Sequence, residues 1–420
     1  MKRVVLSVSF TLLVSWLYGQ VTLQECQRKA QENYPLVRQY GLIEQTKEYN
    51  LENAAKGYLP QFSLSAKATY QSTVTELPVQ VPGIHIKGLP KDQYQVMLEL
   101  KQNIWDGGEI RTRKKQTEAS SEVEREQLYV DMYALNDRVN QLYFGILLLD
   151  EQLKQNTLLQ EELERSFKQV SAYIENGVAN QADLDAVKVE QLNTRQKRIE
   201  LAASRDAYLK MLSQMTGEEL AAGTTFLKPA AGNDISRLEN EIRRPELSFL
   251  NAQGQQLNIQ EDALKTQYMP RFGLFVQGAY GNPGLNMLEN KFTPYYIAGV
   301  RLSWNFGSLY TLKNDRRVIE NNRQRLLSNR DVFLFNTRLQ MKQQNNAITS
   351  VQKQMKDDEE IIRLRSSIRR AAEAKVANGT LTVIEMLREI TNENLARQTK
   401  ALHEIQLLMN IYQLKYTTNN

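Results

Sequence analysis

Four short segments of the chain alternate apolar and polar residues with a period of two. They cover about residues 61–72, 93–105, 271–281 and 294–306. Such alternation predicts β-strands with one apolar face and one wet face. The charged residues within the alternating windows all fall on the polar phase: Lys67, Glu99, Lys101 and Arg301.

The ends of these segments are aromatic, as at Tyr70, Tyr94, Tyr280 and Trp304. Segments of about ten residues with this pattern are typical of transmembrane β-strands, although a soluble sheet with one wet face is the alternative. Four strands cannot close a barrel, and open edges are not tolerated in lipid. We therefore expect oligomerisation, with three copies giving twelve strands around a lumen lined by the four charged residues.

Proline is confined to a few parts of the chain. None of the ten prolines lies between residues 91 and 228, and none follows Pro294. Because proline is costly inside a helix, these stretches can hold very long helices, roughly 100 Å between Gly108 and Asn176 at the rise of an α-helix. The Pro- and Gly-rich segments 72–93 and 281–294 are expected to be hairpin loops.

The predicted helices are mostly polar with a narrow apolar stripe, which favours a coiled-coil seam over a globular core. An ordinary antiparallel coiled coil is the alternative for the helices alone. One stripe runs through Leu153, Leu159, Leu163, Phe167, Val170 and Ile174. The other contains Leu381, Ile384, Leu387, Leu395, Leu402, Ile405, Met409 and Tyr412.

An internal duplication organises the chain. Tyr34-Pro35 matches Arg244-Pro245, Ile104–Gly107 matches Trp304–Gly307 at an offset of 200, and Asn176-Gly177 matches Asn378-Gly379 at an offset of 202. Ordered landmarks of this kind indicate a repeat. We expect a first repeat over residues 21–217, a linker over 218–243 and a second repeat over 244–420.

The remaining composition narrows the function. Residues 1–20 resemble a secretory signal peptide. The single cysteine, Cys26, is expected to be a packed helix thiol rather than a lipid-attachment site, and the two histidines are too isolated to suggest a metal.

The charge is nearly balanced, with 53 basic and 48 acidic residues, which does not suggest nucleic acid. Acidic pairs such as Asp357/Asp358 are expected to be solvated. No catalytic motif is present, so neither an enzyme nor a cofactor is expected.

These features resemble the outer-membrane efflux protein (TolC) family. The markers are Tyr-Leu-Pro-Gln before the first strand (58–61), Trp-Asp-Gly-Gly after the second (105–108) and the two Asn-Gly turns. The resemblance implies a mainly α-helical chain with a membrane β-barrel, built from a duplicated helix-strand-strand-helical hairpin unit. In the family, a trimer forms a 12-stranded barrel continuous with a 12-helix tunnel, and the linker lies near the equator of the tube.

The resemblance also places the periplasmic tip of the tunnel at the turns that contain Asn176, Gly177, Asn378 and Gly379. Asn180 and Thr382 are candidate caps of the return helices. The family's acidic positions at the tip match Asp183 and Glu385, whereas Arg388 departs from the pattern. Three copies of Glu385 and Arg388 are expected to form a charged constriction, the alternative being an exposed intrahelical ion pair.

The function implied by the resemblance is that of a passive exit duct in a tripartite efflux or type I secretion system. Its partners would be two more copies of the chain, outer-membrane lipid, a periplasmic adaptor and an inner-membrane pump of the RND, ABC or MFS type. It would lie in the bacterial outer membrane with its helices in the periplasm. A periplasmic coiled-coil adaptor or scaffold is the alternative.

Overall fold

The computed structural model describes residues 20–74, 89–230, 241–287 and 289–419. The expected signal peptide therefore lies almost entirely outside the described residues, as do most of the first hairpin loop and the centre of the linker. The chain forms two compact units. The helical unit comprises residues up to Val37, Val130–Arg244 and Phe333–Asn420, and the sheet unit comprises Arg38–Tyr129 and Pro245–Val332. Both units thus draw on both of the predicted sequence repeats.

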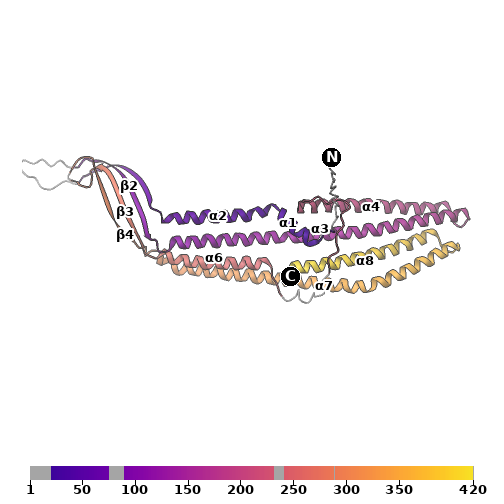
Figure 1. Ribbon diagram of the computed structural model, residues 1–420. Helices are drawn as coiled ribbons and strands as arrows, with labels where there is room; N and C mark the ends of the chain where they lie inside the picture. The colour runs from indigo at the N-terminus through magenta and orange to yellow at the C-terminus, as the bar shows by residue number, and fades with distance from the viewer. Residues whose placement is uncertain (1–19, 75–88, 231–240, 288, 420) are drawn as a thin grey trace, which may run out of the picture. The chain divides into compact units, whose positions relative to one another are not determined.

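The sheet unit contains four antiparallel strands in the order β1-β2-β3-β4. Their bounds are Gln61–Tyr70, Asp92–Trp105, Arg271–Asn282 and Thr293–Ser303, and Figure 1 shows β2, β3 and β4 side by side. Leu98 lies opposite Leu64 and Gly278, and Val276 lies opposite Ala298, so the strands keep their alternation in phase. One face of the sheet is consequently apolar and the other polar.

Helices lead into and out of the strands. Helix α2 (Arg38–Ala55) precedes β1, and α6 (Pro245–Gln267) precedes β3. The long helix α3 (Glu109–Glu175) follows β2, and α7 (Ser308–Ala377) follows β4. Two short 3₁₀ helices, Pro35–Val37 and Lys56–Tyr58, complete the connections before β1.

Matching side-chain turns end β2 and β4. The carboxylate of Asp106 accepts hydrogen bonds from the backbone N–H groups of Gly108 (2.9 Å) and Ile110 (2.7 Å). The amide oxygen of Asn305 accepts one from Gly307 N–H (3.0 Å). These two turns pair Asp106 with Asn305, so the repeat offset here is 199 and not the expected 200. The two tryptophans that precede them, Trp105 and Trp304, are therefore equivalent.

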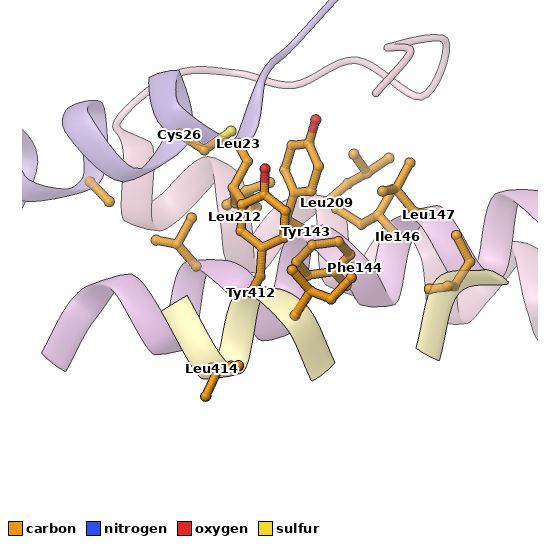
Figure 2. Packing of buried hydrophobic residues seen from close by; sticks show 14 of the residues in the cluster. Leu23, Cys26, Tyr143, Phe144, Ile146, Leu147, Leu209, Leu212, Tyr412 and Leu414 are labelled. Atoms are coloured by element: carbon orange, nitrogen blue, oxygen red, sulfur yellow. The ribbon is translucent and has the colours of Figure 1, made fainter. Parts of the chain in front are cut away.

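The helical unit is held together by a core near the chain's first helix, α1 (Leu23–Asn33). Side chains from α1, α3, α4 (Gln181–Thr216) and α8 (Val383–Thr418) converge there, as Figure 2 shows for Leu23, Phe144, Leu212 and Tyr412. Tyr143 is buried, and its hydroxyl lies 2.8 Å from the carbonyl oxygen of Val21 and 2.7 Å from that of Leu227. This contact fixes the start of the linker onto the helices.

Cys26 lies in the same core and is a free thiol, in keeping with its interpretation as a packed helix residue (Figure 2). Burial raises the pKa of this thiol to about 12. Because the thiolate is the reactive form, this shift disfavours reaction of Cys26 at neutral pH.

A second core cluster lies where the long helices approach their turns. It joins Leu163 and Val170 of α3, Val187 of α4, Val376 of α7 and Ile390 of α8. The apolar stripe expected on α3 is buried at Leu159, Leu163 and Val170.

The stripe expected on α8 is partly wrong. Ile384 and Leu395 are 62% and 60% exposed, whereas Met386 and Ile390 are fully buried. The buried side of α8 also accommodates the polar residues Glu393 and Asn394, so an apolar pattern alone could not locate it.

The expectation that Asp357/Asp358 is a solvated pair is wrong for Asp358. Its side chain is buried, and its carboxylate lies 2.8 Å from Nδ1 of His403 on α8. A partner distant in the sequence thus compensates for its burial.

None of the helices in the described part of the chain is both long and apolar enough to cross a membrane.

Candidate functional site

The apolar face of the sheet lacks a covering layer within the described chain. Leu64 on β1 and Val300 on β4 are each 72% exposed, and Leu98 and Leu274 on the inner strands are also exposed. Exposed apolar patches of this kind mark surfaces that meet lipid or another protein.

The opposite face carries all four charged residues predicted from the alternation. Glu99 is at its centre, with a carboxylate oxygen 2.7 Å from Nζ of Lys101 and another 3.6 Å from a guanidinium nitrogen of Arg301. The side-chain amide of Gln277, directly opposite on β3, donates a 2.8 Å hydrogen bond to the same carboxylate. Three partners from three strands therefore hold Glu99.

Arg301 also lies over an aromatic ring. Its guanidinium carbon is 4.9 Å from the centre of the Phe275 ring, which belongs to the polar face despite being apolar. Gly299 lies opposite Phe275, and a Cβ atom there would approach the ring to 3.0 Å. The missing side chain at Gly299 makes room for the ring under the cation.

Lys67 stands apart from this cluster. It lies on β1 opposite Gln95, on the same face as Glu99 and Lys101. Its side chain is exposed and makes no ion pair within the described residues. Lys67 thus contributes a positive charge that no carboxylate of the described residues neutralises.

The second candidate region consists of two turns in the helical unit, α3–α4 and α7–α8. Gly177 and Gly379 adopt φ angles of +69° and +70°, which favour glycine. After each glycine, a backbone N–H bonds back to the end of the helix, from Val178 to Tyr173 O (2.8 Å) and from Thr380 to Lys375 O (2.9 Å). Both are Schellman-type ends that satisfy orphan carbonyl groups. Asn176 and Asn378 donate matching 2.8 Å bonds from their side chains, four residues back.

The return helices begin with matching capping boxes. Asn180 accepts from Asp183 N–H (3.2 Å), and the Asp183 carboxylate accepts from Asn180 N–H (3.0 Å). Thr382 and Glu385 repeat this arrangement at 3.2 and 3.1 Å. Two predicted tip residues, Asp183 and Glu385, therefore also satisfy helix N-terminal groups.

Glu385 and Arg388 do not form an ion pair with each other within the described structure. Hydrogen bonds from the backbone and side chain of Thr382, followed by the charge of Arg388, lower the pKa of Glu385. The Arg388 side chain is 70% exposed and lies 3.7 Å from the carboxylate of Glu389. Glu385 is thus held by its own helix end, whereas Arg388 projects into solvent.

A partly buried ionic cluster around Glu393 was not predicted from the sequence. Arg369 of α7 pairs with Glu393 of α8 (2.6 Å), with Glu162 of α3 (3.0 Å) and with Glu373 one turn along its own helix. Arg397 holds the second oxygen of Glu393 at 2.6 Å. The cluster ties three helices together near the second core.

Burial alone would raise the pKa of Glu393, but its hydrogen bonds to Arg397 and Arg369 and their charges outweigh this effect and lower the pKa. The sequence contained one signal for this cluster, the i,i+4 spacing of Glu393 and Arg397. It contained none that separates half-buried Arg369 from the exposed arginines nearby.

The comparisons with known proteins agree with this architecture. Residues 27–218 match the family model described as outer membrane efflux protein. No curated protein matches the sequence.

Solved structures of outer-membrane proteins share the fold at low identity. The outer-membrane channel OprN has a TM-score of 0.68 and 14% identity over 94% of this chain and 89% of its own. VceC from Vibrio cholerae has a TM-score of 0.67 and 11% identity over 95% and 96%. MtrE from Neisseria gonorrhoeae, solved in an open state, has a TM-score of 0.65 and 14% identity over 95% and 89%.

Proposed function

The resemblance of this chain to the outer-membrane efflux protein (TolC) family is confirmed, and from this premise we propose that it is one protomer of a homotrimeric exit duct. The duct is a passive conduit in the outer membrane and not an enzyme. An inner-membrane pump of the RND, ABC or MFS type and a periplasmic adaptor would deliver its cargo.

The observation that carries this proposal is the two-faced sheet. Its apolar face is exposed in the single chain, and its polar face collects charged residues. In the described part of the chain, the end strands β1 and β4 each pair with one neighbouring strand. Lipid cannot satisfy their free backbone groups, so β1 of one copy must pair with β4 of the next. Three copies close an even, twelve-stranded barrel of the kind found in outer membranes.

The helical unit supports association of copies independently. Val189, Leu192 and Ile199 form an exposed apolar stripe on α4. Ile361, Leu364 and Ile368 form another on α7. Both recur at helical spacing and lack cover in the single chain, so we propose that they meet between copies as the seams of a twelve-helix tunnel.

The experiment begins with the full chain expressed with its N-terminal segment. The mature protein should appear in the outer-membrane fraction, purify as a trimer in detergent and conduct in planar bilayers. A protein that stays soluble without detergent as a single copy would contradict the duct and favour a periplasmic adaptor or scaffold.

We also propose that Asp183, Glu385 and Arg388 lie at the tunnel tip, with Glu385 and Arg388 forming a charged constriction. Because Glu385 closes a capping box, alanine would damage the helix end as well as remove the charge. Glutamine can keep the box. The Glu385→Gln, Arg388→Gln double variant should therefore change single-channel conductance and ion selectivity while the trimer remains intact. Unaltered conductance and selectivity would rule the constriction out.

A further inference from the structure

The polar face of the sheet carries an excess of positive charge. Along the described strands, its interior positions hold three cations, Lys67, Lys101 and Arg301, against one carboxylate, Glu99. A fourth cation on this face, Arg271, sits at the start of β3 and pairs with Glu109 of α3 at 2.9 Å. The interior of the face therefore has a net charge of +2 for each copy.

The one carboxylate is largely withdrawn from solvent. The Glu99 side chain is 14% exposed and is held by Lys101, Arg301 and Gln277. The side chains of Lys101 and Arg301 remain about half exposed, at 48% and 51%. Lys67 is exposed and unpaired within the described chain. A solute passing this face would therefore encounter positive groups.

Structural roles account for part of this arrangement. Arg301 lies over Phe275 and pairs with Glu99, so it stabilises the sheet. A lysine on an edge strand can also discourage wrong pairing. Neither role requires the excess charge, because one cation would suffice for Glu99 and β1 ceases to be an edge once copies pair.

We propose that this polar face makes the pore selective for anions and suits the duct to anionic solutes. This inference rests on the proposed function, which places the polar face in a shared aqueous lumen. Three copies would then arrange a net charge of +6 around the lumen. Low-dielectric walls concentrate such a field and raise the local concentration of counter-ions. Rings of lysine and arginine favour anions in pores, as acidic rings favour cations.

The test measures the reversal potential of the purified trimer in planar bilayers under a KCl gradient, because potassium and chloride have similar mobility. The wild type should prefer chloride. Lys67→Gln should lower the chloride-to-potassium permeability ratio, and Lys67→Glu should lower it further, about twofold or more overall. Lys67 has no ion-pair partner among the described residues, so both changes alter its charge without breaking an ion pair seen there.

Two controls separate charge from structural damage. Lys67→Arg keeps the charge and should leave the reversal potential unchanged. Glu99→Gln keeps the size of the side chain, removes the one carboxylate at an interior position of this face in the described strands, and should shift selectivity further toward chloride.

The failures are distinguishable. A wild-type trimer that does not conduct would overturn the duct and this inference together. A conducting trimer that prefers potassium would overturn this inference, as would a permeability ratio that does not change with the charge at position 67. Neither result would contradict the proposal that the trimer is a duct.

Discussion

Individual charged residues have different roles depending on what surrounds them. Glu385 and Asp183 complete helix ends, Lys67 is exposed without an ion pair among the described residues, and Glu393 is 5% exposed between two arginines. Removing one member of a buried ion pair leaves its partner uncompensated, which costs far more than the pair contributes as a whole. Glu393 is therefore a charge whose loss should cost the helical unit stability.

Glu393→Gln should lower the free energy of unfolding by about 1–3 kcal/mol at neutral pH, because both arginines lose a charged hydrogen-bond partner while Arg369 keeps Glu162. Thermal unfolding followed by circular dichroism in detergent, at fixed protein concentration, would measure it. Because the pKa of Glu393 is lowered from 4.5, this stabilisation is present above pH 4.5 and disappears as the pH falls through the lowered value. The difference between variant and wild type should accordingly shrink in acid.

The control is Glu164→Gln. Glu164 forms an exposed i,i+4 pair with Lys168 at 3.7 Å. Loss of the ion pair between Glu164 and Lys168 should change the free energy of unfolding by less than about 1 kcal/mol. Equal effects of the two variants would show that burial at Glu393 carries no special weight.

Among the secondary-structure elements, the strands give the sharpest test of the membrane assignment. Successive residues of a strand lie on opposite faces of the sheet, one apolar and one polar. Leu64 points to the apolar face and Ser65, the next residue, to the polar face. Introducing the same side chain at position 64 and, separately, at position 65 therefore tests which face of β1 meets lipid.

Leu64→Lys should reduce assembly into the outer membrane, since a lysine facing lipid at mid-depth costs about 2–4 kcal/mol. Ser65→Lys should be tolerated, because water surrounds that face. The measurement is the amount of heat-resistant trimer in the outer-membrane fraction. If both variants assembled equally, or Ser65→Lys were the worse, the assignment of the faces would be reversed or wrong.

The proposed trimer depends on apolar surfaces that are exposed to solvent in the single chain. The exposed stripes on α4 and α7 are the clearest of these on the helices. Their exposure means that changes there should spare the fold of each copy and act on association.

Ile199→Glu and Leu364→Glu should each weaken the trimer while leaving the helical content unchanged. Light scattering in detergent would report the oligomeric state, and circular dichroism the fold. Lys168→Glu, at a polar exposed position on α3, is the control and should remain trimeric. A stable trimer from all three variants would show that the stripes lie outside the seams.

Much of the architecture follows from local sequence patterns, because those patterns act over a few residues. Alternation sets which side chains share a face of a strand, and the four charged residues indeed share one. Proline-free stretches allow long helices, and Asn-Gly followed by Asn180 or Thr382 specifies a left-handed helix end and a new cap. None of these features requires a distant partner.

Burial is different, because it depends on which distant segments meet. No pattern showed that Asp358 would be buried against His403, that Arg369 would join Glu162 and Glu393, or that α8 would bury Met386 in place of Ile384. More than one side of an amphipathic helix can be buried, and the neighbouring helices that pack against it decide which side is. The same packing placed parts of both predicted repeats in each compact unit, which the order of the predicted repeats along the chain did not reveal.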